Sequence, residues 1–225
     1  MDITLVDPKE RKASYLVKEG ESLTLNLALF DVFSTFEIDV DVERDAHFLG
    51  AVADFASGEG KFILNVHLKG EGSSAEVHSA VLTKGDSKKV YETSVYHEAP
   101  HTSGLMSNYG ITRDASRLTF SGVSEIKKYA SSSETHQAAK IIVFDPECDG
   151  KCQPILNIDE NDVVASHAAV VGKLNDEHLF YMLSRGIDEE SAKRLITLGY
   201  LKPVEQYFVS EDVRKKIDEA IEGGI

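Results

Sequence analysis

The sequence predicts a mainly β protein that ends in a short helical segment. Apolar and polar side chains alternate with a period of two through the first two-thirds of the chain, which is typical of strands with one buried face. Glycine-rich breakers separate these runs at intervals of roughly 10–15 residues, as in sandwiches, barrels and solenoids. Near residue 173 the apolar spacing changes to that of helices. No strand–helix–strand rhythm appears, which argues against a doubly wound α/β sheet.

The strands predicted in the first half each carry one apolar face. Leu23, Leu25 and Leu27, for example, alternate with polar residues. Such alternation sends one set of side chains inward and the other into water. The predicted runs are residues 23–29, 36–42, 62–68, 75–81 and 91–97.

The strands predicted after His101 are shorter pieces. A weak spacing near 22–24 residues between glycine-bearing turns matches one coil of a solenoid, but no strict repeat motif is visible. From the residues, a sandwich and a β-helix both remain open. The predicted pieces are residues 108–112, 116–122, 140–144 and 154–158.

Three short helices are predicted to close the chain. Asn175 and Asp188 each precede a segment with helical apolar spacing, and both are suitable N-cap residues. Arg185-Gly186 is expected to end the first helix and Gly199 the second. The third stretch has apolar residues at helical spacing from Val204 to Ile221. We expect these apolar stripes to face the core.

Composition and charge argue against nucleic-acid binding and membrane association. The chain of 225 residues carries 24 Lys and Arg against 38 Asp and Glu, a formal net charge of −14. This acidic balance argues against contact with a phosphate backbone, so no nucleic-acid partner is expected. The sequence has no run of 18 apolar residues and no secretory signal at its start, so we expect no membrane association and a cytoplasmic location.

The common signatures of catalysis are missing. The sequence holds no Gly-x-x-x-x-Gly-Lys-Ser/Thr phosphate loop, no Gly-x-Ser-x-Gly elbow and no His-Glu-x-x-His pair, so the chain is not expected to be an enzyme. Cys148 and Cys152 are separated by three residues, but a structural zinc site takes four ligands and no histidine follows at a finger-like distance. Two free loop thiols are the favoured interpretation.

One stretch, residues 157–192, has a distinctive order of features. A Ser-His pair is followed by small residues, a short helix, an Arg-Gly-Ile turn and an acidic helix start. With several short pieces further back, this pattern resembles the SufB/SufD family, the scaffold proteins of the SUF iron–sulfur cluster assembly system. The resemblance extends over about residues 100–202 and is more SufD-like. The matching pieces are Tyr109-Gly110-Ile111, Phe120-Ser121-Gly122, His136-Gln137, Ser166-His167, Phe180-Tyr181 and Arg185-Gly186-Ile187.

The resemblance implies a fold and a set of partners. The fold would be a right-handed parallel β-helix (a solenoid) over residues 1–168, followed by a small C-terminal helical domain over residues 169–225. The function would be that of a scaffold subunit, which docks the ABC-type ATPase SufC and pairs with a SufB-like partner or with itself as a homodimer. The implied ATPase-docking residues are Leu179, Phe180, Tyr181, Arg185, Gly186 and Ile187.

His167 falls on the motif histidine of the family, which makes it the candidate cluster or metal ligand. Ala138, Ala165 and Ala168 stand where SufB or SufD carries Cys or Glu, so other thiolate or carboxylate ligands are missing. Clusters generally need several thiolates. No tightly bound cofactor is therefore expected, and a transient iron–sulfur cluster or iron would be shared with the partner subunit.

Two other interpretations stay open. A metal-dependent all-β enzyme would use His167 together with His136, Cys148 and Cys152 as metal ligands. A degenerate structural assembly protein would keep dimerisation and have no cluster role.

Overall fold

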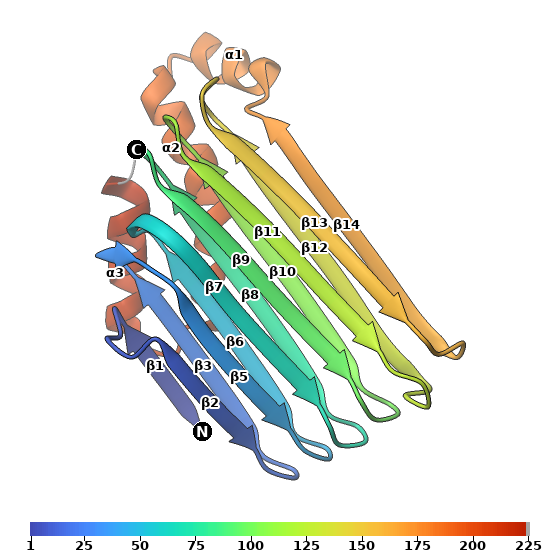
Figure 1. Cartoon of the computed structure of the whole chain (residues 1–225). Helices are drawn as coiled ribbons and strands as arrows, with labels where there is room; N and C mark the ends of the chain where they lie inside the picture. Colours follow the sequence, from blue (N-terminus) through green and yellow to red (C-terminus); the bar gives the residue numbers. More distant parts are fainter. Residues whose placement is uncertain (224–225) are drawn as a thin grey trace.

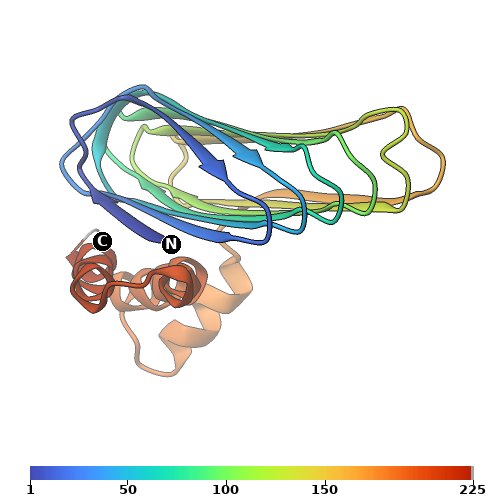
Figure 2. The ribbon, with the colours of Figure 1, turned by 90° about the horizontal axis from the view of Figure 1, so that it is seen from below.

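The chain folds into a flattened parallel β-solenoid with a helical layer on one of its two faces (Figures 1 and 2). The structure is a computed structural model that describes residues 1–223, with the backbone alone at position 176. Successive strands alternate between two sheets, A and B, so that each coil contributes one strand to each face. The predicted solenoid and C-terminal helices are confirmed, and the sandwich is excluded because the strand pairs between coils are parallel.

Sheet A holds strands from alternate positions in the chain, in the order β1-β3-β6-β8-β10-β12-β14. Parallel neighbours within it are in continuous register, as between β10 and β12. Its strands are β1 (Asp2–Val6), β3 (Ser22–Leu29), β6 (His47–Asp54), β8 (Ser74–Thr83), β10 (Ser103–Thr112), β12 (Ser133–Val143) and β14 (Val163–Lys173).

Sheet B forms the opposite wall, in the order β13-β11-β9-β7-β5-β2, with the short β4 pairing to β7. Its strands are β2 (Lys12–Val17), β4 (Val32–Phe33), β5 (Phe36–Val42), β7 (Ser57–Leu68), β9 (Lys88–His97), β11 (Arg117–Ile126) and β13 (Asp149–Ile158).

The first coil matches the predicted spacing of 22–24 residues, and the later coils are longer. The register offset between neighbouring strands of sheet A is 22 residues where Asp2 faces Thr24, and it grows to 31 where Ser103 faces Glu134. The growth explains why no strict repeat shows in the sequence. The strands after His101 were predicted too short, since they run for 10 or 11 residues.

Segment 163–173 was not predicted as a strand, yet it forms β14, the last strand of sheet A. Its burial alternates little because no further coil covers it. The strand continues to Lys173, beyond the predicted domain boundary at residue 168. The helical segment therefore follows directly on the final strand.

The two sheets enclose the main core. Side chains that alternate along each strand point inward and pack together, among them Phe48, Phe62 and Leu64, all at most 2% exposed. The interior also holds one fully buried ion pair. The Asp54 carboxylate lies 2.7 Å from Lys89 Nζ and accepts a hydrogen bond of 2.6 Å from the Tyr91 hydroxyl.

The helices begin where their caps predict. α1 (Asp176–Ser184) is capped by Asn175, and α2 (Glu189–Leu201) by Asp188, each through a side-chain oxygen that accepts a backbone N–H. α1 ends at the predicted Arg185-Gly186 turn, where Gly186 has φ of +83°.

Two predicted helix boundaries were wrong. α2 does not stop at Gly199 but continues to Leu201. The third predicted stretch is divided into a 3₁₀ helix, η1 (Lys202–Tyr207), and α3 (Glu211–Gly223). The break has a local reason, because the amide N–H of Val209 donates to the side chain of Asn26 on β3. That bond ties the linker to the sheet.

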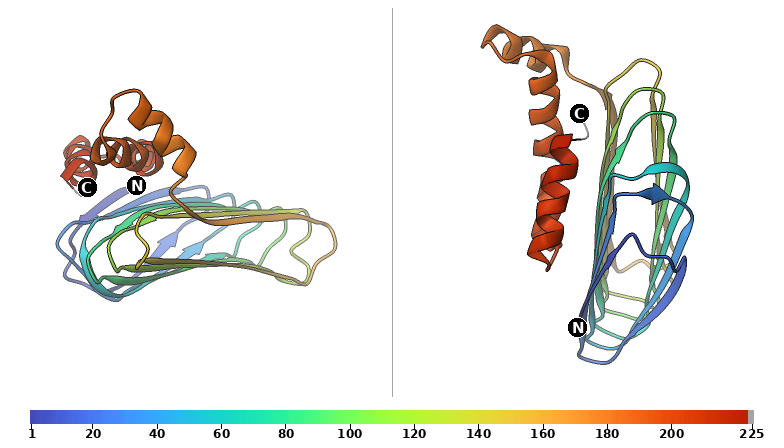
Figure 3. Two further views of the ribbon diagram at one scale, coloured as in Figure 1. Left: turned by 90° about the horizontal axis from the view of Figure 1, so that it is seen from above. Right: turned by 90° about the vertical axis from the view of Figure 1, so that its left-hand side faces the viewer.

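The end of α2, η1 and α3 lie on the outer face of sheet A (Figure 3). Their buried residues, such as Leu201, Phe208 and Ile217, pack on a strip of small and apolar residues that includes Ala53 and Ala80. The expectation that these apolar stripes face a core is confirmed, and the core they face is the second one of the molecule. None of the described helices is long and apolar enough to cross a membrane.

Candidate functional site

The last coil leaves one end of the solenoid uncovered. β14 pairs with β12 and β13 pairs with β11, and each forms the edge of its sheet. Apolar side chains of β14 are unusually exposed here: Val171, which points toward the interior, is 43% exposed, and Val164 and Val170, on the outer face of the sheet, are 59% and 50% exposed. Unpaired strand edges with apolar side chains are interaction surfaces. We call the exposed surface of β13 and β14 the open end.

His167 lies in the middle of β14 and points into this open end. It is in register with Gln137 of β12 and, one coil further, with Met106 of β10. Met106 belongs to the interior core, so His167 lies in an inward-facing row. With no coil above it, the imidazole is exposed while remaining on the inner side of the wall.

Polar residues line the interior beneath His167. Gln137 donates through Nε2 to the Ser124 hydroxyl at 2.8 Å and to the backbone carbonyl of Ile155 at 3.0 Å. Its Oε1, like Asn108 Oδ1 one coil below, is buried and has no protein partner within the described residues. Buried polar atoms of this kind are usually satisfied by ordered water.

The two cysteines occupy different places. Cys152 is on β13 in register with the core residue Phe120, so its thiol points inward near the open end. Burial raises the pKa of this thiol to about 11, so it is protonated at neutral pH and is a weak ligand. Cys148 is buried in the turn before β13, where Thr112 donates to its sulfur at 3.2 Å. This contact supports a structural role for Cys148.

His136 lies on the opposite side of the wall from His167. It is one residue from Gln137 on β12 and therefore faces outward, where Nε2 donates to Glu134 and Nδ1 contacts the Ser166 hydroxyl, each at 2.6 Å. Among the residues the structure describes, no group of three or more His, Cys, Asp or Glu side chains could hold a metal ion. The four ligands of the metalloenzyme interpretation are not brought together.

The three alanines that replace Cys or Glu of SufB or SufD lie on different faces of sheet A. Ala165 is two residues from His167 and lies in the same inward set on β14. Ala138 and Ala168 are in register with each other in the outward set. A thiolate at position 165 would lie on the same side of the sheet as His167, and Ala165 supplies none.

A second exposed surface lies on α1. Phe180 is 73% exposed, Tyr181 59% and Leu183 42%, whereas the other helices bury their apolar faces on sheet A. The Arg185 guanidinium lies 5.1 Å from the ring centroid of Tyr181, and Leu179 and Ile187 are half-buried. α1 stands away from the solenoid (Figures 2 and 3). The apolar surface of α1 is thus free for a partner.

The open end and the α1 surface are directly joined. Leu174 and Asn175 alone separate β14 from α1, and the Leu174 amide donates to the Val143 carbonyl at the end of β12. Sequence reasoning found the α1 residues but missed the exposed valines of β14. The signal was the run of small and β-branched residues in 163–171, which favours a strand.

Comparison with known proteins assigns the family. Residues 23–200 match the family model described as the SufBD core domain of the SUF system for FeS cluster assembly. The chain belongs to the SufB/SufD family. It is 32% identical over 156 residues to the iron-sulfur cluster assembly protein SufD of Bacillus subtilis, which covers 69% of the chain and 36% of that protein.

Other members are more distant. Identity to SufB of the same Bacillus subtilis strain is 27%, over 60% of the chain and 30% of that protein. Identity to a SufBD family protein of Mycobacterium tuberculosis is 26%, over 71% of the chain and 19% of that protein. The chain therefore spans about a third or less of the length of these relatives, and it is more SufD-like than SufB-like.

Proposed function

We propose that this SufB/SufD family chain is a non-catalytic scaffold subunit in iron–sulfur cluster assembly. The observation that carries the proposal is the combination of an uncovered last coil with a neighbouring, exposed apolar helix in a chain of this family. Each surface suits a different partner. The open end suits a second solenoid, and α1 suits a SufC-type ABC ATPase.

Exposure and connectivity support ATPase docking through α1. The side chains of Phe180 and Tyr181 offer a large apolar and aromatic surface, the kind enriched at interface centres. A force on α1 would reach β14 through the two-residue connection at Leu174 and Asn175. Movements of the ATPase would in this way act on the end of the solenoid that carries His167.

Co-purification with a SufC-type ATPase tests this docking. Phe180→Glu should lower the amount of captured ATPase at least about tenfold, since an anchor residue contributes about 2 kcal/mol or more. Val209→Glu is the matched control, because Val209 is also apolar and is 51% exposed, but it lies between η1 and α3. Equal capture by the wild type and Phe180→Glu would refute docking through α1.

Pairing through the open end would also complete a shared cluster site. The cluster is cargo here, and one imidazole and one protonated thiol are too few ligands to hold it. A SufB-like partner, or a second copy in a homodimer, would cover the exposed valines and supply the remaining ligands. This arrangement fits an imidazole on the inner wall of an uncovered coil.

Anaerobic cluster transfer from the reconstituted complex separates this role from a purely structural one. His167→Ala should reduce transfer while the complex still assembles, whereas His136→Ala, on the outer face, should not. If His167→Ala transfers clusters at the wild-type rate, the chain is a structural subunit without a cluster role. Sedimentation of the chain with and without a SufB-like partner measures pairing at low micromolar concentration. Cytoplasmic location remains a prediction.

A further inference from the structure

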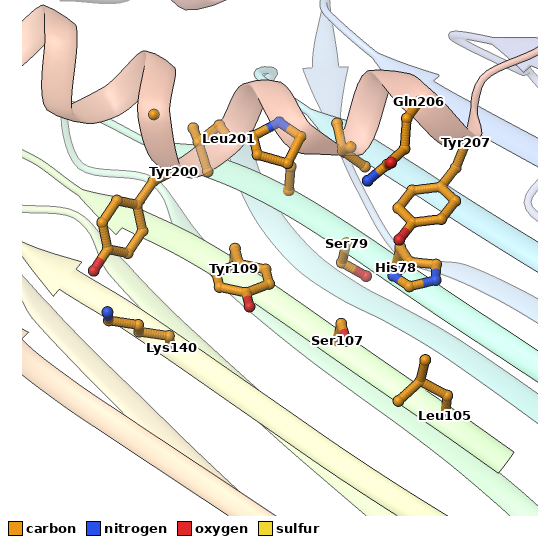
Figure 4. Close-up of a pocket in the computed structure, with 14 residues that line it drawn as sticks. His78, Ser79, Leu105, Ser107, Tyr109, Lys140, Tyr200, Leu201, Gln206 and Tyr207 are labelled. Carbon is orange, nitrogen blue, oxygen red and sulfur yellow. The ribbon is translucent and has the colours of Figure 1, made fainter.

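A cavity of about 450 Å³ lies between the helical layer and the outer face of sheet A (Figure 4). Its size is within the range of pockets that take small molecules. Residues of β10, with flanking positions of β8 and β12, form its floor, and the end of α2 and η1 form its roof. It is on the opposite side of the wall from His167.

The cavity exists because the side chains between the layers are small in its middle. Ser107 lies on the floor between Leu105 and Tyr109, and Ala80 is next to Tyr109 in the register. In the roof, a Cβ added to Gly199 would meet no atom within 4 Å. Elsewhere along the same face, larger residues such as Phe55 and Leu82 close the gap to the helices.

The charge of the lining is unlike that of the chain. The protein carries 38 acidic residues and a net charge of −14, yet among the described side chains no Asp or Glu lines the cavity, while Lys140 does. A second cavity of about 500 Å³ adjoins it, with Lys140, Gly199 and Tyr200 common to both. The described side chains that line this second cavity include no carboxylate, and they add Lys173 and His178. A groove of this composition favours an anion.

Aromatic rings form both ends of the first cavity (Figure 4). At one end Lys140 Nζ lies 4.6 Å from the ring centroid of Tyr200, and Tyr109 meets Tyr200 edge to face at 6.4 Å. At the other end His78 and Tyr207 are stacked with centroids 3.7 Å apart. Burial lowers the pKa of His78, although Glu76 opposes the shift, so this ring is neutral at pH 7. The rings are held in place and can take a flat ligand between them.

We propose that this cavity binds a small planar aromatic molecule that carries a negative charge. The ring of the ligand lies between the Tyr109–Tyr200 pair and the His78–Tyr207 pair, and its anionic group contacts Lys140. The hydroxyl of Ser107 and the amide of Gln206 are available for hydrogen bonds. Nucleoside monophosphates and aromatic carboxylates both have this chemistry. The site is independent of docking through α1 and of the open end.

Calorimetric titration of the purified full chain with adenosine monophosphate and with 4-hydroxybenzoate tests the proposal. At least one probe should bind with a dissociation constant below about 1 mM. Binding of the nucleotide alone or of the carboxylate alone identifies which source of the chemistry the site takes. No binding of either probe at that concentration overturns the proposal.

Variants show whether the binding is in this cavity. Lys140→Gln should weaken it about tenfold by removing the charge, and Ser107→Leu should abolish it by filling the floor. Lys128→Gln is the matched control, because Lys128 Nζ also lies over a tyrosine, Tyr129, at 5.2 Å but on an exposed turn. Unchanged binding to Lys140→Gln, or an equal loss in Lys128→Gln, overturns the assignment. If Ser107→Leu does not fold, the two lysine variants still decide.

Discussion

The two ends of the solenoid differ in what fills them. Between β3 and β7 the interior is almost entirely Leu, Val, Ile and Phe. From β8 onward, polar side chains take the same inward rows: Val52 is followed by Ser79 and Asn108, and Leu64 by Thr93. Several of these polar atoms are buried without a protein partner among the described residues.

This difference between apolar and polar interiors suggests that different coils of the solenoid serve stability and function. Apolar rows bury their faces against neighbouring coils and hold the solenoid together. Polar rows contain buried polar atoms without partners, which cost free energy. These rows end at the uncovered last coil, which carries His167. We infer that the first coils stabilise the fold and that the last coils are kept suited to partner contact. Four predictions test this comparison.

The largest contrast is expected between two inward-facing leucines. Leu64 is 2% exposed in the apolar interior, and Leu64→Ala should destabilise the chain by about 3 kcal/mol through lost burial and a cavity. Leu156 faces inward on the last coil but is half-buried, so Leu156→Ala should cost about 1 kcal/mol. Urea unfolding measures both. Equal losses would mean that the two ends are equally well packed.

Low pH should destabilise the fold by protonating His97, which lies in the half of the solenoid with polar inward rows. Burial lowers the pKa of His97 to about 4, below its value of about 6.5 in an unfolded chain. The unfolded state therefore binds the proton first as the pH falls, and stability is lost between about pH 6.5 and pH 4. The contribution of this one group is about 3 kcal/mol.

His97→Gln is the comparison that isolates this effect. The variant removes the titrating ring and keeps a polar side chain, so its unfolding free energy should fall less steeply with acid than that of the wild type. Thermal or urea unfolding at a series of pH values measures the difference. Parallel pH profiles for the two proteins would show that His97 is not protonated on unfolding.

Removing an unpartnered hydroxyl from the polar interior should stabilise the chain. Thr93 is 1% exposed and its Oγ1 has no hydrogen-bond partner within the described chain, so Thr93→Val should gain about 1 kcal/mol. The converse exchange on the same strand, Val95→Thr, should lose about 1–3 kcal/mol because Val95 is fully buried. Melting temperatures report both. A loss in Thr93→Val would show that buried water satisfies the hydroxyl.

The smallest effect on stability is expected at the open end. Val164 is 59% exposed, so Val164→Lys should change the unfolding free energy of the isolated chain by less than about 0.5 kcal/mol. Association is a separate matter, since an added lysine at a strand edge blocks pairing. Sedimentation should show loss of the dimer or of the complex with a SufB-like partner. Unchanged association would place the interface elsewhere.

Much of the fold was readable because its signals are local. The apolar alternation in segments such as 36–42 follows from a pleated strand with one wet face. The caps Asn175 and Asp188 act within three residues of themselves, so the helix starts were found. The structure leaves Phe180 and Tyr181 of α1 exposed, and their contact with a partner stays a prediction.

Other features depend on which coil lies beside which. Coil length varies from 22 to 31 residues, so no fixed period in the sequence could place neighbouring strands. Whether His136 and His167 share a face depends on the register of β12 with β14, and that register puts them on opposite faces. The cavity beside Lys140 arises from small residues on strands and on a helix that are far apart in the chain.

The amino-acid sequence alone determined which segments form strands, where the helices start and which family the chain resembles. These features follow from propensity, capping and short motifs, which act over a few neighbouring residues. The inward orientation of His167, the burial of α3 and the exposure of α1 were decided by packing between distant segments. Those outcomes depend on which surfaces stay exposed after the coils have stacked, and no local sequence pattern determines which surfaces these are.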